Sequence, residues 1–547
     1  MKKWKVLSTN TKITSEDDVA RELFKLRKID KKTSEKFLNP KISDLKIEEC
    51  GILLPELEKG IKRIKKAIKK DERIIILGDY DVDGICASAI LWETLYKKHS
   101  KSLPYIPDRF SEGYGISVKT VDNLLEKYPD VKLIITVDNG IVANESIAYA
   151  GKKGIDVIIT DHHAKGETLP NAHAIIHTTA LCGAGVAWML ARSLGIENED
   201  AINEKLELAA LATVADLVPL TGFNRVIVKT GINYLRNTKR VGLIELFKIA
   251  KIEKEKIDTY HIGFIIGPRL NASGRISHAK ESLRLVCSAD KNYVKKTAFL
   301  LDQTNRLRQQ MVKESALHAK LSVLKEKTLG KLIIVFDKSY SEGVVGLIAS
   351  KLVEEYYRPT LAISIGEKIS KGSARSIKGV NIIDLIRKYE KHLIGAGGHP
   401  MAAGFTIETE KIELFKSEIV KGVEKEIADE LLNSEVRIDM EVPIGVVTMN
   451  LFNKIEDFAP FGMENPKPTF MIRGAKIINL GRVGNDSSHL KIDIEKDGKS
   501  LPAIGFGLGD REINIGDTID IAFAIDVNEW RDRKTLQLKI KDLTAKN

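Results

Sequence analysis

Three short runs of β-branched residues, each followed by an acidic or histidine-bearing tip, constrain the fold of this chain more than any other feature. The runs are RIIIL at residues 73–77, KLIIT at 132–136 and DVIIT at 156–160. Stretches with the apolar spacing of helices separate them, so the pattern predicts βαβ units and a buried parallel sheet. In such sheets, binding sites form at the carboxyl ends of the strands.

The tips of these three strands carry side chains that are able to bind metal ions or take part in catalysis. They read GDYDVDG, VDNG and TDHH. If residues 79–83 continue as an extended strand end, alternation points Asp79, Asp81 and Asp83 to one side. Asp138 and the adjacent pair His162 and His163 belong to the same sheet edge, and Asp216 follows a further apolar run.

So many carboxylates at one edge require a positive partner. Two charges ~4 Å apart repel by roughly 4 kcal/mol at an effective dielectric near 20. Oxygen and imidazole donors without a thiolate favour Mn²⁺ or Mg²⁺ over structural zinc. The number of donors favours two cations that share a bridging carboxylate, a site typical of phosphodiester or pyrophosphate hydrolysis. Any one of these aspartates taken alone is also a typical helix N-cap.

Length, charge and cysteine content limit the class of protein. The 547 residues are enough for three or four domains. Basic residues exceed acidic ones by 86 − 75 = 11, which suits a polyanionic partner. We expect no membrane span and no signal peptide. Four cysteines without a CxxC pair indicate a reducing, cytoplasmic compartment. No GxxxxGK[ST] loop is present, so we expect no nucleotide cofactor.

The pattern along the chain divides it into five segments. A lysine-rich lead-in contains a short helical stretch, and the first α/β region follows it. Residues 290–329 lack glycine and proline, so we expect one long connecting helix there, with two shorter helices as the alternative. A second α/β region and a five-stranded β-barrel of the OB type complete the chain. The predicted boundaries are 1–50, 51–289, 290–330, 331–432 and 433–547.

The helical stretch LPELEKGIKRIKKAIKK opens the first α/β region. Leu57, Ile61, Ile64 and Ile68 mark one apolar face, and lysines cover the rest. The lysines are predicted to be a solvated face, with contact to nucleic acid as the alternative.

The motifs resemble those of a known superfamily. GDYDVDG, VDNG, DHH and ADLVPL, in this order, resemble the four motifs of the DHH phosphoesterases, and GAGGHPMAAGF resembles the histidine motif of the DHH-associated domain. Further stretches resemble one family within it, the bacterial single-strand exonucleases. These are KFLNPKISDL, IPDRFSEGYG, GAGVAWMLA, LVPLTGFNRVIVKTG, GPRLNASGR, GSARSI, APFGMENPKPTF and VNEWRDRKTLQLKI. The resemblance implies a DHH catalytic domain, a long helix, a DHH-associated domain and an OB domain.

The resemblance also implies roles for individual residues. The metal ligands would be Asp79, Asp81, Asp83, Asp138, His162 and Asp216, with Asp138 as the bridge. Asp81, Asp138, His162, His163 and His399 would take part in catalysis, and His399 would hold the scissile phosphate. Arg109, Ser373 and Arg375 would bind the 5′ end and nearby phosphates, Asn271 and Arg275 would line the strand path, and Tyr114 would stack on a base.

Some of these roles compete with structural readings. Arg275 suits an ion pair, Tyr114 suits turn packing, and His399 suits a core position. Two stretches also depart from the family pattern: Tyr340-Ser341 replaces a Trp-His pair, and His177-Thr178 stands where the family has Asn-Pro. Neither departure removes a metal ligand, but both bear on how substrate is positioned.

The resemblance implies a metal-dependent 5′→3′ exonuclease of single-stranded DNA that acts as a monomer in recombination and repair, alongside a helicase and a single-strand-binding protein. One alternative is a DHH phosphodiesterase of short oligoribonucleotides or cyclic dinucleotides, although such relatives generally lack the OB barrel. Another is an inactive DNA-binding scaffold, although such relatives lose metal ligands that are intact here.

Overall fold

The computed structural model divides the chain into two compact units, each described here by itself. The first unit comprises residues 15–305 and 447–468, and the second comprises residues 1–14, 306–446 and 469–547. The described residues are 2–10, 12–108, 111–113, 115–276, 279–326, 328–530 and 533–545; the side chains of residues 275, 276 and 530 lie outside the description.

The first unit is built on a five-stranded parallel sheet, as the alternating pattern predicts. Its strand order is β3-β2-β4-β5-β6, and every neighbouring pair is parallel. The strands are β2 (Arg73–Gly78), β3 (Ser102–Tyr105), β4 (Val131–Val137), β5 (Asp156–Asp161) and β6 (Ala174–His177). The three β-branched runs form the central strands β2, β4 and β5, which are buried almost throughout.

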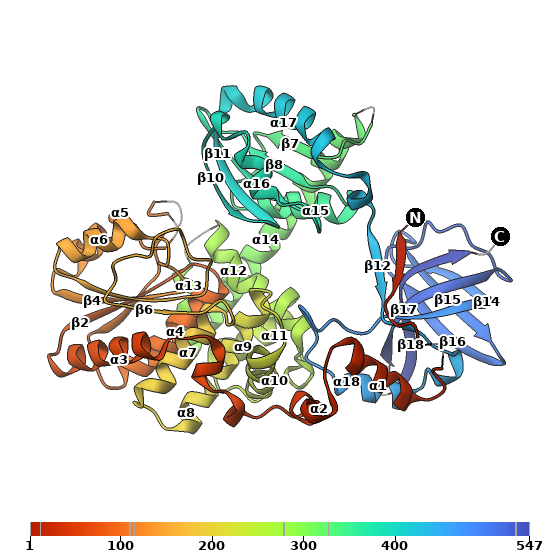
Figure 1. Cartoon of the computed structure of the whole chain (residues 1–547), viewed down its shortest axis with the longest axis horizontal. Coiled ribbons are helices and arrows are strands. Elements are labelled where there is room, and N and C mark those ends of the chain that lie inside the picture. Colours follow the sequence, from red (N-terminus) through yellow and green to blue (C-terminus); the bar gives the residue numbers. More distant parts are fainter. Residues whose placement is uncertain are drawn as a thin grey trace. The chain divides into compact units, whose positions relative to one another are not determined.

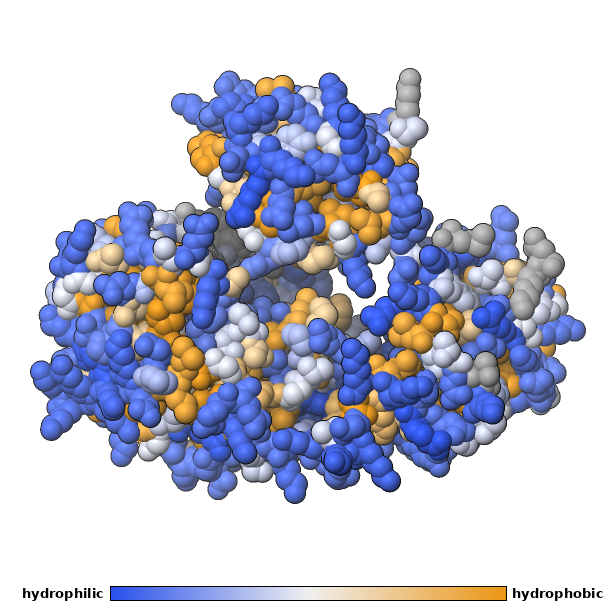
Figure 2. Space-filling model, in the orientation of Figure 1, coloured by the Kyte–Doolittle hydropathy of each residue, from blue (hydrophilic) through white to orange (hydrophobic). Residues whose placement is uncertain are grey.

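Helices cover both faces of this sheet (Figure 1). One core packs α3 (Leu54–Lys69), α4 (Val82–Tyr96) and α7 (Gly183–Leu194) against alternate strand residues, and a second core packs α5 (Val118–Lys127) and α6 (Asn144–Lys152) against the other residues. In α3, Leu57 and Ile64 are buried while its lysines are exposed. Exposed lysines suit a solvated face and contact with nucleic acid alike, so both readings stay predictions. Hydrophilic residues likewise dominate the face seen in Figure 2.

Further helices extend the larger core. They are α8 (Glu199–Glu204), α9 (Leu206–Ala215), α10 (Gly222–Arg236), α11 (Val241–Ala250), the π-helical segment η4 (His261–Ile266), α12 (Gly267–Ile276) and α13 (Lys280–Cys287). The unit also contains α1 (Glu16–Leu26), α2 (Lys31–Leu38) and α18 (Met449–Glu456). In the described part of the chain, no helix is both long and apolar enough to span a membrane.

The long connecting helix is a single element. α14 (Lys291–Leu324) contains 34 residues, about 50 Å at 1.5 Å per residue. The division between the two units falls within it. The alternative of two shorter helices is therefore wrong.

The second unit contains a second α/β layer. Its sheet has the order β10-β11-β9-β8-β7, parallel only between β7 and β8. The elements are β7 (Ile333–Asp337), α15 (Val345–Tyr356), β8 (Thr360–Ser364), β9 (Ile369–Arg375), α16 (Ile382–Arg387), β10 (Leu393–His399), β11 (Ala402–Glu408) and α17 (Ile412–Glu426).

The second unit also contains the predicted β-barrel. β14 pairs with both β15 and β17, and the order β14-β15-β16-β18-β17 closes the ring. The strands are β14 (Phe470–Val483), β15 (His489–Lys496), β16 (Lys499–Gly505), β17 (Thr518–Trp530) and β18 (Arg533–Ala545), with the short β13 (Met440–Glu441) added to β14.

One strand in the lead-in was not expected from the sequence. β1 (Lys3–Val6) pairs in parallel with β12 (Glu435–Ile438), so the first residues of the chain belong to the second unit. Four residues are too few to show a reliable period, and the partner is more than 400 residues away. The predicted helix in the lead-in is confirmed as α1, capped by Ser15.

A buried arginine joins three segments of the first unit. Arg225 in α10 is 2% exposed, its guanidinium lies 3.6 Å from the Phe37 ring centroid, and it donates hydrogen bonds to the carbonyls of Phe37, Phe458 and Ala459. Each such charge-assisted bond contributes about 1.5–3 kcal/mol.

We therefore expect Arg225→Met to lower the free energy of unfolding of the first unit by at least about 3 kcal/mol, because the three carbonyls lose their donor. Urea titration monitored by circular dichroism measures this loss, and hydrogen exchange should show faster exchange in α2 and at residues 458 and 459. An exposed control, Arg21→Met in α1, should change neither readout. Unchanged hydrogen exchange in Arg225→Met would show that Arg225 does not join these segments.

Candidate metal centre

The turn between β2 and α4 brings three aspartates together. Asp79 follows β2, Asp81 caps α4, and Asp83 lies in the first turn of α4. Asp81 Oδ1 accepts hydrogen bonds from the backbone N–H groups of Asp83 and Gly84. The expectation of an extended strand end over residues 79–83 is thus wrong: the carboxylates converge because a helix starts within the motif. The N-cap reading holds for Asp81.

The Asp83 carboxylate is buried against the start of another helix. Its two oxygens accept the backbone N–H groups of Gly183 and Ala184, the first residues of α7, at 2.7 and 2.6 Å. The partial positive charge at a helix N-terminus favours a carboxylate there. A Cβ added at Gly183 would lie 2.5 Å from the Cβ of Asp138. Glycine at this position therefore lets α7 approach both aspartates.

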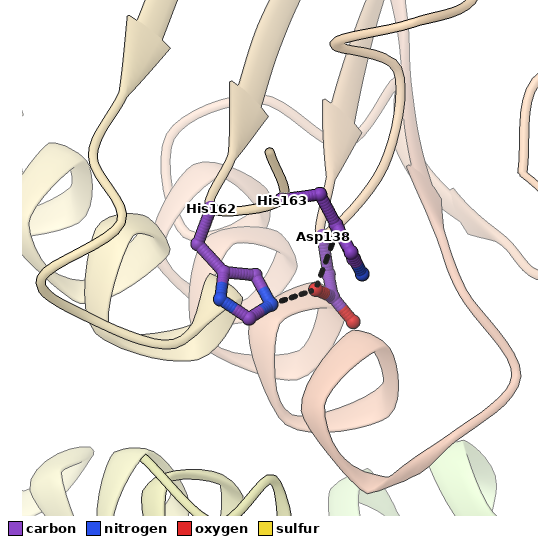
Figure 3. A group of neighbouring side chains, drawn as sticks. All are labelled: Asp138, His162 and His163. Atoms are coloured by element: carbon purple, nitrogen blue, oxygen red, sulfur yellow. Dashed lines mark ion pairs between the residues drawn. The ribbon is translucent and has the colours of Figure 1, made fainter. Parts of the chain in front are cut away.

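Asp138 stands at the centre of the cluster. It follows β4, is 2% exposed and has a left-handed backbone with φ +64°. Its Oδ1 lies 3.1 Å from His162 Nε2 and 4.0 Å from His163 Nδ1, as Figure 3 shows. Both histidines follow β5, so two neighbouring strand ends deliver these three side chains.

Asp161 supports the histidines. Its Oδ1 accepts the backbone N–H groups of His162 and His163 and lies 2.8 Å from His163 Nδ1, while its Oδ2 accepts the N–H of Ile141. Burial alone would raise the pKa of Asp161, but these bonds outweigh it and the pKa lies below its usual value. Asp161 therefore orients the two histidines from behind.

Asp216 completes the cluster from a helix rather than a strand. It is the C-cap of α9, and its Oδ2 lies 3.7 Å from His162 Nε2. Among the described residues, three groups hold donor atoms within 4.8 Å of one another: Asp79, Asp81 and Asp138; Asp83, His162 and Asp216; and Asp138, His162 and His163. Asp138 and His162 each belong to two groups.

The crowding of acids perturbs their protonation. Burial first, and then the Asp81 charge, raises the pKa of Asp83 to about 7, while burial, Asp83 and Asp81 raise that of Asp216 to about 8. Burial and four neighbouring carboxylates raise the pKa of Asp138 well above its usual value. Burial lowers the pKa of His163, but the adjacent Asp161 carboxylate outweighs it and raises that pKa to about 9.

These residues fit a pair of hard divalent cations. The donors are carboxylate oxygens and imidazole nitrogens, the types that Mn²⁺ and Mg²⁺ accept. Without a cation, the raised pKa values of these carboxyl groups favour their neutral, protonated form. A bound cation would stabilise the ionised form and displace the proton. A carboxylate shared by two donor groups suits a bridge.

The predicted phosphate-binding residues of the second unit lie near the same end of neighbouring strands in its sheet. Ser373 and Arg375 lie on β9, and Arg375 donates a hydrogen bond to Ser373 Oγ at 2.9 Å. His399 ends β10 and faces Ala402 of β11, which faces Arg375 of β9. His399 is exposed, so the reading of a core histidine is wrong.

Of the four remaining predicted residues, the structure describes the side chain of Asn271. Arg109 and Tyr114 lie outside the described residues. Arg275 belongs to α12, but its side chain lies outside the description. Asn271, also in α12, accepts the backbone N–H of Val82 through Oδ1 at 2.9 Å. Asn271 therefore holds the turn of the three aspartates, a role the sequence did not suggest.

His177 and Tyr340, which belong to the two stretches that depart from the family pattern, each lie within hydrogen-bond distance of a neighbour. His177 Nε2 lies 2.7 Å from the carbonyl oxygen of His163, so it anchors the DHH loop. Tyr340 is 1% exposed, and its hydroxyl lies 3.0 Å from His318 Nδ1.

Comparisons with known proteins agree with this architecture. Family models match the DHH family N-terminal domain at residues 73–214, the DHHA1 domain at 329–425 and the RecJ OB domain at 438–542. A DHH domain, a DHH-associated domain and an OB domain in this order define a phosphoesterase of the DHH class.

Relatives narrow the class to one family. The chain is 38% identical to the single-stranded-DNA-specific exonuclease RecJ of Bacillus subtilis over 88% of this chain and 63% of that protein, so it spans less than two thirds of that relative's length. It is 32% identical to the protein of the same name from Salmonella typhimurium, over 90% of both chains. The crystal structure of Thermus thermophilus RecJ with Mn²⁺ matches 100% of this chain and 80% of that one, with a TM-score of 0.85 and 25% identity. The chain belongs to the RecJ family.

We predict that Gly183→Ala weakens the metal centre, because the new methyl group would overlap Asp138. Overpacking of this kind costs about 1–3 kcal/mol. Calorimetric titration should show weaker Mn²⁺ binding, and the melting temperature should fall. Gly151→Ala is the matched control, since nothing lies within 4 Å of its Cβ position in α6. Wild-type Mn²⁺ affinity in Gly183→Ala would contradict the tight approach of α7.

We also predict that the metal-free protein loses stability as pH rises from about 4 to about 8. The folded state holds protons on Asp83 and Asp216 more tightly than the unfolded chain, whose aspartates titrate near 3.9. The raised pKa of His163 also lowers the stability of the folded state as pH rises from about 6.5 to about 9.

Thermal melts in EDTA between pH 5.5 and 8.5 measure this loss. Added Mn²⁺ should raise the melting temperature more at pH 8.5 than at pH 5.5, since protons compete with the cation. The control Asp216→Asn should flatten the pH dependence. A metal-free protein that becomes more stable over this pH range would refute the raised pKa values.

Proposed function

We propose that this protein is a metal-dependent exonuclease that hydrolyses single-stranded DNA from the 5′ end, in recombination and repair. The observation that carries the proposal is the set of donor groups in which Asp138 and His162 are shared. Membership of the RecJ family supports the substrate and the reaction, because its curated relatives are named as exonucleases specific for single-stranded DNA. The 5′ direction rests on the family resemblance alone.

The proposed ligands are Asp79, Asp81, Asp83, Asp138, His162 and Asp216, and the proposed cations are two Mn²⁺ or Mg²⁺ ions. Relatives crystallised with each of these ions support this choice. Asp138 is the proposed bridge because it belongs to one all-carboxylate group and to one histidine group. His163, held by Asp161, lies beside the proposed ligands rather than among them.

The chemistry divides between the cations and the protein. When bound, two divalent cations lower the pKa of the attacking water and neutralise charge on the phosphate. The protein holds five of the donor side chains at the turns that follow β2, β4 and β5, and Asp216 at the end of α9. Asp161 accepts the N–H of Ile141, which links the turn after β5 to the turn after β4, and the α7 N-terminus holds Asp83. This pre-organisation reduces the rearrangement that binding requires.

A polar shelf in the second unit supports the proposed phosphate contacts. Ser373 pairs with Gly404, which pairs with Gly397, and nothing lies within 4 Å of a Cβ at either glycine. Side chains of residues directly opposite one another point to the same face. The shelf therefore has an open glycine floor with Arg375 and His399 at its rim. Arginine's planar fork suits phosphate oxygens.

The barrel offers an aromatic surface of the kind that binds single strands. Phe506 is 53% exposed, the ring of His489 lies edge-on to it at 5.2 Å, and Lys539 Nζ lies 5.4 Å from its centroid. An exposed ring next to a cation suits a stacked base with a nearby phosphate.

The alternatives are less well supported. A match to the RecJ OB domain disfavours a phosphodiesterase of short oligoribonucleotides or cyclic dinucleotides. The complete donor set disfavours an inactive scaffold. We further propose a monomer in the cytoplasm that works with a helicase and a single-strand-binding protein. Four free cysteines support the reducing location, and the other points rest on resemblance.

End-labelled oligonucleotides test the proposed activity. Purified protein with Mn²⁺ or Mg²⁺ should release labelled mononucleotide early from a 5′-labelled single strand, and late from a 3′-labelled one. Hydrolysis of RNA dinucleotides alone would favour the phosphodiesterase, and tight DNA binding with no hydrolysis would favour the scaffold. Early release from the 3′ label would overturn the direction.

Asp138→Asn tests whether hydrolysis depends on the shared carboxylate. Asparagine tolerates the left-handed backbone at this position better than alanine does. We expect the variant to remain folded, to bind DNA, and to lose at least about 1,000-fold in rate, since one group supports both proposed cations. Wild-type rates would rule out the two-cation model. Asp156→Asn, at the opposite end of β5, is the control and should retain full activity.

A further inference from the structure

Two aromatic rings on one helix are exposed and stacked on each other. Tyr260 and Phe264 are 58% and 70% exposed, and their ring centroids lie 5.2 Å apart with planes inclined by 27°. Side chains of this size are usually largely buried. We call this pair the aromatic plate.

The plate is built on the segment that packs against a proposed metal ligand. Tyr260 directly precedes η4 and Phe264 lies within it. A Cβ at Gly263 would lie 3.8 Å from the Val214 side chain, and one at Gly267 would lie 3.5 Å from that of Ala215. Val214 and Ala215 end α9 immediately before Asp216. The helix that carries the plate therefore touches the end of α9 that presents Asp216.

The helix that carries the plate also leads to the residue that holds the turn of the three aspartates. Phe264 lies in the π-helical segment η4, and α12 continues directly from η4 to Asn271, seven residues later. Asn271 accepts the N–H of Val82 in the turn of the three aspartates. Seven helical residues span at most about 10 Å along the axis. A short run of one helix therefore connects the plate to the aspartate turn.

The size and rim of the plate indicate what it binds. A stable protein interface buries about 800 Å² on each partner, far more than two rings provide. Next to the plate, His261 Nδ1 lies 2.6 Å from Asp258 Oδ1, so the rim is polar. Two flat rings with a polar rim match one or two nucleobases, which stack on aromatic side chains whatever their sequence.

We propose that the aromatic plate stacks bases of the single-stranded substrate a short distance from the metal centre. This inference rests on the proposed function. An enzyme that removes nucleotides of any sequence requires contacts that do not read base edges, and stacking supplies them. The phosphate contacts assigned above position the backbone, while the plate holds the bases.

Alanine variants of the plate test the proposal by DNA affinity. In the Asp138→Asn background, Tyr260→Ala with Phe264→Ala should bind a fluorescent 20-nucleotide single strand ~10- to 100-fold more weakly, since a stacked base contributes about 1–3 kcal/mol. Tyr260→Phe and Phe264→Tyr keep the rings and should bind as the parent does. Because both side chains are exposed, we expect the melting temperatures to be unchanged.

A matched aromatic pair provides the control. Trp92 and Tyr96 are also four residues apart, with ring centroids 5.3 Å apart, and Tyr96 is 48% exposed. Tyr96 is the last residue of α4, about 20 Å along the helix from the turn of the three aspartates. Tyr96→Ala should leave DNA affinity unchanged. An equal loss of affinity in Tyr96→Ala and in the plate variants would overturn the proposal.

Abasic substrates separate stacking from a general structural role. A single abasic site moved along the strand should weaken binding at one or two positions only, and those positions should no longer matter in the double plate variant. A uniform response along the strand, or an unchanged DNA affinity in the double variant, would overturn the proposal that the plate stacks bases. If the plate variants behave as expected but the protein with intact Asp138 hydrolyses no DNA, the proposed function is wrong and the base-stacking proposal remains supported.

Discussion

The burial of several carboxylates around Asp138 is the constraint on which the rest of the first unit depends. Each pair of such charges ~4 Å apart costs roughly 4 kcal/mol at an effective dielectric near 20. The protein offsets part of this cost with two backbone N–H groups from α7 and with raised pKa values for Asp83, Asp138 and Asp216. The repulsion that is not offset gives the cluster its affinity for cations. The site therefore favours cations because the protein does not fully balance the negative charge of its carboxylates.

The fold exists to bring these groups to one edge. β2, β4 and β5 deliver two aspartates and two histidines from their ends, while α9 delivers Asp216 and α7 delivers the donors to Asp83. Residues outside the three donor groups keep this arrangement in place. Asp161 orients the histidines, Asn271 ties α12 to the aspartate turn, and His177 anchors the DHH loop. Membership of the RecJ family gives this arrangement its biological meaning.

Much of the architecture could be predicted from the sequence. The strands of the parallel sheet and of the barrel have strong, short periodic patterns bounded by turn residues, and α14 has neither glycine nor proline. The short strand β1 could not be predicted, because its pairing with β12 depends on a partner far along the chain. The candidate ligands were predicted as a set, but their local geometry was wrong: the motif GDYDVDG bends into a helix, so a period of two does not apply to it.

The sequence by itself determined the kinds of groups available: acids and histidines at strand ends, glycines in the second α/β region, and alternating strands near the end of the chain. Those properties follow from local spacing and residue chemistry. Only the tertiary structure decided which groups meet. Gly183 touches Asp138 although 45 residues separate them, Asp161 supports the two histidines, and Tyr260 and Phe264 remain exposed beside α9. Such contacts depend on how distant segments pack, and local sequence patterns do not encode them.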